Sequence, residues 1–129
     1  MTALALFERV AGLARAGSAA GVARRLGLAR DVAAEGLAWT GPPALGGAQR
    51  VNVRAARNGA VDLVELVLDP ESGPTRAELE AALGRAEQQP RMPGAGRVAL
   101  AFPPRGGITP LAYVDDATGR AGRLVARRD

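Results

Sequence analysis

In the stretch RVNVRAARNGAVDLVELVLD, residues 50–69, the spacing of apolar residues changes from the helical spacing upstream to a period of two. In both halves of it apolar residues alternate with polar ones, which is the period of a β-strand with one buried face. The pair Asn58-Gly59 joins the two halves, and these residues readily take the positive φ angles of a two-residue hairpin turn. The stretch therefore predicts an antiparallel β-hairpin.

The turn type fixes which residues face each other across this hairpin. A two-residue turn sets Arg57 opposite Ala60, and the pairing then runs back to Val53 opposite Val64. The face that we expect to pack on a core carries Val51, Val53, Ala55, Val64, Leu66 and Leu68. The other face, which we expect to be only partly covered, pairs Asn52 with Glu65 and Arg54 with Leu63.

A helix and three further strands follow the hairpin. Thr75 and Glu78 form a capping box, which predicts a helix that begins there and ends near Glu87. Pro110 favours an edge strand, or a strand that begins after it. The three strands are expected at 98–102, 108–114 and 123–127, the last two joined by a turn at 115–119.

Upstream of the hairpin the apolar residues recur at helical spacing. Ser18 is a predicted N-cap and Gly27 a left-handed stop, so three short helices are expected, the third over 30–38. The fold class is then α+β, with N-terminal short helices followed by an antiparallel ββαβββ sheet that carries one packed helix. We divide the chain into a three-helix segment 1–39, a Pro/Gly-rich linker 40–49 and a sheet with its helix 50–129, and leave open whether the two folded segments share one core.

The segment AAGVARRLGLARDVAAEGL, residues 19–37, resembles the helix-turn-helix superfamily. Ala23 lies four residues before the turn glycine Gly27, and Val32 and Leu37 fall where the second helix turns its apolar side to the first. The resemblance implies that the second helix enters the DNA major groove and that the hairpin serves as a wing.

Two features of this segment depart from the superfamily. Ala29 stands where Ser or Thr commonly caps the second helix. The exposed positions of that helix include Asp31 and Glu35, whose charge repels phosphates. The residues that would bind DNA under this interpretation are Arg24, Arg25, Arg30, Arg50, Arg54 and Arg57.

The arginines also have a structural interpretation. Residues 60–90 contain two arginines against seven acidic residues, between basic flanking stretches. Folding that sets these segments side by side pairs the strand arginines with Asp62, Glu65 or Asp69. Arginines that are paired in this way favour a protein-binding role over a DNA-binding role.

The 129-residue chain has no histidine, cysteine or lysine, so all 17 basic residues are arginine. This composition excludes disulfides, imidazole or thiolate metal sites, and histidine acid–base catalysis. We expect no catalytic residues, no metal and no cofactor, and predict that the protein is not an enzyme. The lysine-free composition, rich in Ala, Arg and Gly, is similar to that of proteins from GC-rich bacterial genomes.

Two functions remain open. The first is a non-catalytic protein-binding or adaptor module, whose partner is another protein or a second copy, because alanine-rich faces bury little area alone. The alternative is a DNA-binding transcriptional regulator of helix-turn-helix type that reads duplex DNA. Without interleaved aromatic residues single-stranded nucleic acid is not an expected partner. No segment has the ~20 apolar residues of a membrane span, so we predict no membrane contact and a cytoplasmic location.

Overall fold

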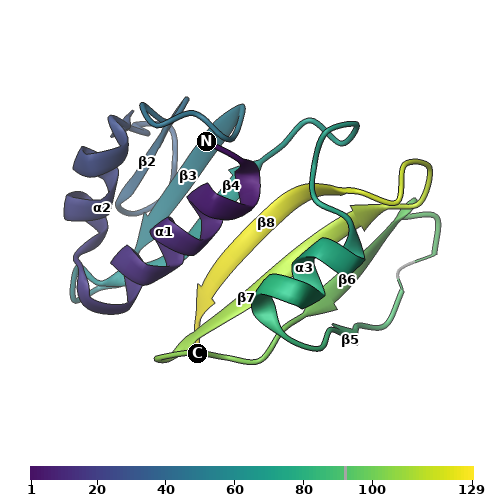
Figure 1. Cartoon of the computed structure of the whole chain (residues 1–129). Coiled ribbons are helices and arrows are strands. Elements are labelled where there is room, and N and C mark those ends of the chain that lie inside the picture. The colour runs from purple at the N-terminus through teal and green to yellow at the C-terminus, as the bar shows by residue number, and fades with distance from the viewer. Residues whose placement is uncertain (92) are drawn as a thin grey trace.

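The computed structural model describes residues 1–91 and 93–129. Three helices and eight strands make up this part of the chain (Figure 1). The helices are α1 (Ala3–Ala16), α2 (Ala19–Leu26) and α3 (Arg76–Leu83). The strands are β1 (Ala29–Arg30), β2 (Ala38–Gly41), β3 (Arg50–Ala55), β4 (Val61–Val67), β5 (Glu87–Gln88), β6 (Arg97–Ala101), β7 (Ile108–Asp115) and β8 (Ala121–Arg128).

The strands form one antiparallel sheet in the order β1-β2-β3-β4-β8-β7-β6-β5. All three helices lie on the same side of it (Figure 1). The α+β prediction is confirmed, with one helix packed on the C-terminal part of the sheet. The sheet is wider than expected, because β1, β2 and β5 extend its two edges.

The central hairpin has the predicted register. Val53 pairs with Val64 and Asn52 with Glu65, so the apolar face points at the core. The turn itself differs: the Gly59 N–H donates to the Ala56 carbonyl over 2.9 Å, and Gly59 takes the left-handed conformation while Asn58 does not. This three-residue loop is compensated by a register shift between Arg54 and Ala55, so the strand pairing beyond it is unchanged.

The predicted third helix over 30–38 is wrong. Residues 29–30 and 38–41 are strands, and the loop between them begins with Asp31 Oδ1 accepting from the Ala33 N–H over 3.2 Å. That local bond competes with the first turn of a helix, and Gly36 adopts a φ of 75° that no helix permits. Pairing of β2 with β3 then satisfies the backbone instead.

The helix-turn-helix geometry is therefore not formed in residues 19–37. The first of its two helices is present as α2, with Ser18 accepting from the Gly21 N–H over 3.0 Å and Gly27 at a φ of 72°, as predicted. The second helix is replaced by β1 and the loop after it. The first two residues of the expected linker, Thr40 and Gly41, belong to β2.

The C-terminal elements need two corrections. The Thr75 cap of α3 is confirmed, but the helix ends at Leu83 and not near Glu87, because Gly84 leaves the helix at a φ of 100°. Pro110 lies inside β7, which is an interior strand. The Pro110 carbonyl accepts from the Phe102 N–H, so the missing proline N–H faces a position beyond the last residue of β6.

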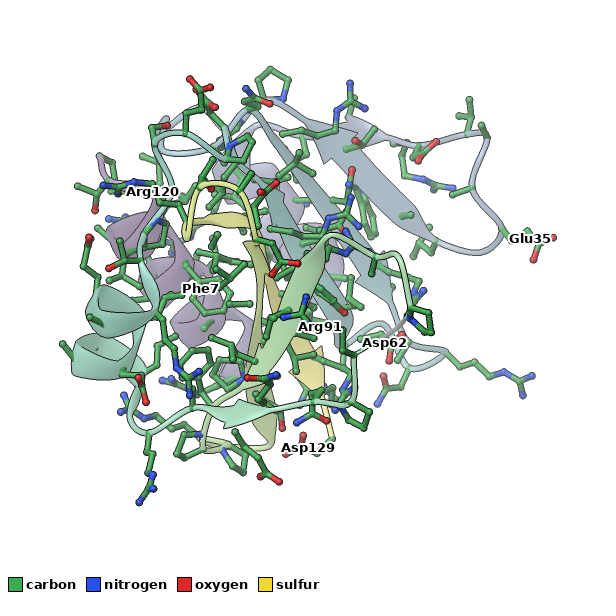
Figure 2. All side chains as sticks on the ribbon, turned by 90° about the vertical axis from the view of Figure 1, so that its right-hand side faces the viewer. Phe7, Glu35, Asp62, Arg91, Arg120 and Asp129 are labelled. Atoms are coloured by element: carbon green, nitrogen blue, oxygen red, sulfur yellow. The ribbon has the colours of Figure 1, made fainter. Side chains whose placement is uncertain are left out.

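Both halves of the chain contribute to one hydrophobic core. Phe7 and Val10 of α1, Leu26 of α2, Leu66 of β4 and Leu79 of α3 are fully buried members of the same cluster. Phe7 lies between the helices and the sheet, whereas Glu35 is at the tip of a loop that projects from the molecule (Figure 2). The side of the sheet that the helices cover, which we call the covered side, thus carries the hydrophobic core that stabilises the fold.

Candidate functional site

The side of the sheet that carries no helix is the candidate functional site, and we call it the free face. Its residues follow from the cross-strand register, since side chains directly opposite each other share a face. Across the strands they are Thr40, Arg50, Asn52, Arg54, Leu63, Glu65, Val67, Glu87, Arg97, Ala99, Ala101, Thr109, Leu111, Tyr113, Asp115, Arg123, Val125 and Arg127. In Figure 2, α1 and α3 lie to the left of the sheet and Asp62, which pairs with Arg54, lies to the right.

A chain of polar side chains crosses one half of the free face. The Thr40 hydroxyl donates to Asn52 Oδ1 over 2.6 Å, and Asn52 Nδ2 donates to Glu65 Oε1 over 2.8 Å. Glu65 Oε2 lies 3.2 Å from Arg123 Nη1. Each of these four side chains has a partner, so the hydrogen bonds hold this half of the face in a fixed arrangement.

The centre of the free face is an apolar strip. Leu111 and Val125 sit opposite each other at its centre and are only 8% and 5% exposed. Leu63, Val67 and Ala99 are half-buried around them. Neighbouring side chains of the face therefore already cover most of Leu111 and Val125, and Leu63, Val67 and Ala99 are the apolar residues here that a protein partner could bury further.

Arginines surround this strip, and the structure separates them into two groups. Arg54 pairs with Asp62 at 3.0 Å and Arg123 with Glu65 at 3.2 Å, as the structural interpretation of the strand arginines predicts. Within residues 1–91 and 93–129, three exposed arginines of the face have no carboxylate within 4.0 Å. They are Arg50, Arg97 and Arg127.

Tyr113 lies where the arginines and the strip meet. The Arg97 guanidinium carbon is 4.9 Å from the centre of the Tyr113 ring, a cation–π distance. Tyr113 also faces Arg123 across the β7–β8 ladder. Sequence reasoning missed Arg97 and Tyr113; the signal was the register of the last hairpin, which sets Tyr113 opposite Arg123.

The structure does not bring the six predicted DNA-binding arginines together. Arg24 and Arg25 lie in the last turn of α2, on the covered side, and Arg30 stacks on Trp39 at 5.7 Å. Arg50 and Arg54 lie on the free face. The sixth, Arg57, is in the loop of the central hairpin. A single groove of DNA does not meet both sides of the sheet at once.

Two larger hollows lie elsewhere and are less suited to binding. The one at the start of α1 encloses about 360 Å³, but its Thr2 hydroxyl and Asp69 carboxylate already accept from the Ala5 and Glu71 N–H groups. The one between α1 and α2 encloses about 330 Å³ and is lined mainly by glycine, alanine and other apolar residues, with Arg25. Neither gathers the charge that the free face carries.

Comparison with known proteins shows a solved structure that has a similar fold. Neither family models nor curated proteins give a match to the sequence. The chain is similar in structure to a solved DUF4309 family protein, YjgB, of Bacillus subtilis, with a TM-score of 0.66 and 11% identity over 99% of this chain and 98% of that one. The two chains thus have the same α+β fold. In the described residues, none of the helices has both the length and the apolar character of a membrane span.

Proposed function

We propose that the protein is a non-catalytic protein-binding module whose recognition surface is the free face. The proposal rests on the half-buried apolar residues Leu63, Val67 and Ala99, which lie around the buried Leu111 and Val125, which no helix covers and which arginines border. Apolar centres with a polar rim characterise protein interfaces, and tyrosine and arginine are enriched in them.

The charge of the rim favours an acidic protein as the partner. Arg50, Arg97 and Arg127 are exposed and unpaired among the described residues, whereas Glu65 and Asp62 are each paired with an arginine. The face carries five arginines against the carboxylates of Glu65, Glu87, Asp115 and the adjacent Asp62, so its net charge is positive and opposes the stacking of two copies on it. Complementary charge across an interface raises the association rate and the specificity.

Duplex DNA is disfavoured by the same surface. Its centre is apolar, and the amide of Asn52, which could read a base edge, is already engaged with Thr40 and Glu65. The second helix of the helix-turn-helix resemblance is absent from residues 19–37. Arg24 and Arg25 are two of the arginines that the helix-turn-helix interpretation assigns to DNA, and they lie on the covered side. Reversing their charge therefore tests DNA binding separately from binding at the free face.

The test is capture from an extract of the source cell with two charge-reversal variants. Arg97→Glu with Arg127→Glu alters the free face, and Arg24→Glu with Arg25→Glu is the matched control on α2. We expect the wild-type protein and the control to retain one acidic protein at equal yield, and the free-face variant to lose it. Circular dichroism melting checks that both variants fold.

Two results would overturn the proposal. One is equal retention by the free-face variant and the wild type. The other is recovery of nucleic acid in place of protein, with binding that falls steeply as salt rises and that the α2 variant abolishes.

A further inference from the structure

Two small hollows flank Tyr113 on the free face. The first encloses about 200 Å³ and is lined by Leu68, Pro70, Arg97, Tyr113, Asp115, Gly122 and Arg123. The second encloses about 110 Å³ and is lined by Pro90, Arg91, Ala95, Arg97, Ala99 and Tyr113. Both share Arg97 and Tyr113, so the stacked pair forms the wall between them.

The larger hollow combines two cations with apolar walls. Arg123 uses one guanidinium nitrogen on Glu65, and Arg97 stacks on Tyr113 without a carboxylate within 4.0 Å among the described residues. A guanidinium has five N–H donors, so both arginines keep donors for a further acceptor. Pro70 and the Tyr113 ring supply most of the apolar surface, because Leu68, which also lines the hollow, is only 5% exposed and belongs to the core cluster.

Size limits what this hollow accepts. Pockets for small-molecule ligands are larger, about 300–1,000 Å³, whereas this one encloses about 200 Å³. One side chain of a bound protein is therefore a better match than a metabolite.

The geometry points to an acidic side chain of the partner as the occupant: a glutamate or aspartate carboxylate anchored between Arg97 and Arg123, with its methylene groups against Tyr113. This inference rests on the proposed function and names the group that the free face recognises. Arginine is suited to it because its planar fork binds a carboxylate through two parallel hydrogen bonds. A phosphate is the poorer occupant, because Asp115 lines the same hollow and repels a dianion more than a monoanion.

The experiment is an NMR titration of the purified protein with N-acetylglutamate amide, and with N-acetylglutamine amide as the uncharged control. Tyr113 is the one tyrosine of the chain and Trp39 the one tryptophan, so each ring gives a single assignable set of signals. We expect saturable shifts of the Tyr113 ring and of the Arg97 and Arg123 amides with the glutamate compound. The distant Trp39 ring serves as an internal reference that does not shift.

Two variants give the test a matched control. Arg97→Gln removes one cation of the hollow and is expected to weaken binding about tenfold, the effect of losing a charged hydrogen bond. Arg57→Gln removes an equal charge from the distant hairpin loop and is expected to change nothing.

Three outcomes would overturn the inference. They are equal shifts with the glutamine compound, unchanged affinity in Arg97→Gln, and stronger binding of N-acetyl-phosphoserine amide, which would assign the hollow to phosphate. None of these outcomes bears on the capture experiment, because capture reports on binding by the whole free face. The proposed function and this inference can therefore fail independently.

Discussion

The two faces of one sheet bury the same kinds of side chain to different extents. On β4, Leu66 points to the covered side and is fully buried, while Leu63, three residues earlier, points to the free face and is half-buried. On β8 the neighbours Arg128 and Arg127 divide in the same way. The alternation of side chains that buries one face of the sheet therefore leaves a second, partly exposed surface on the other.

Truncation of the two leucines of β4 should separate the two faces most clearly. Leu66→Ala removes a fully buried side chain and should cost about 3 kcal/mol or more of unfolding free energy. Leu63→Ala removes a half-buried one, and about 1 kcal/mol is expected because less area returns to water. Urea unfolding followed by circular dichroism measures both, and equal losses would contradict the assignment of the faces.

Arg128 is the exception on the covered side, and it gives the second prediction. Its Nη2 donates to the Ala14 carbonyl and its Nε to the Val61 carbonyl, each over 2.7 Å, which ties the end of α1 to the sheet. Arg128→Met should cost about 1.5–3 kcal/mol, the value of a hydrogen bond to a charged group. The adjacent Arg127→Met is the control, and a change within about 0.5 kcal/mol is expected. A larger loss of unfolding free energy in the control would mean that Arg127 stabilises the fold, contrary to its assignment to the free face.

A double-mutant cycle on the free face should give a smaller value. Glu65 and Arg123 form an ion pair at 3.2 Å with side chains 21% and 39% exposed. Water screens such a pair, so a coupling free energy of about 1 kcal/mol or less is expected between Glu65→Gln and Arg123→Gln. Thermal unfolding of the four proteins measures it. A coupling of several kcal/mol would mean that the free face stabilises the fold as the covered face does.

A further prediction concerns pH on the covered side, where α3 leads to β5. The Ala86 N–H donates to Glu80 Oε2 over 3.0 Å, and this bond, aided by Arg76, lowers the pKa of Glu80. A carboxylate with a lowered folded pKa stabilises above its unfolded pKa, and this contribution is lost as the pH falls through the folded value. Protection of the Ala86 amide from hydrogen exchange should therefore fall below pH 4.5. Glu80→Gln should show no such step, and a step that persists in it would assign the change to another group.

The sequence was sufficient to predict elements whose structure depends only on residues nearby in the chain. The alternation over 50–69 fixed the register of the central hairpin even though the loop has three residues and not two, because burial of Val64 and Leu66 overrides the turn. The caps at Ser18 and Thr75 were equally local.

Elements that depend on distant partners were not predictable. The loop after Arg30 carries helical spacing, but its neighbours pair with strands, and that pairing outweighs a weak local preference for helix. The Tyr113 hollow needs the β6–β7 and β7–β8 registers together, since Arg97 and Arg123 reach Tyr113 from opposite sides. Sequence showed these arginines, but not that they converge.

Site-specific photo-crosslinking in the source cell asks directly whether the free face contacts a protein. Benzoylphenylalanine replaces Val67 on the free face in one protein and the exposed Ala20 of α2 in another. A protein adduct from position 67, absent from position 20 and lost when Arg97 and Arg127 are reversed to glutamate, is the predicted result. Adducts from position 20 alone would place recognition on the covered side and contradict the account.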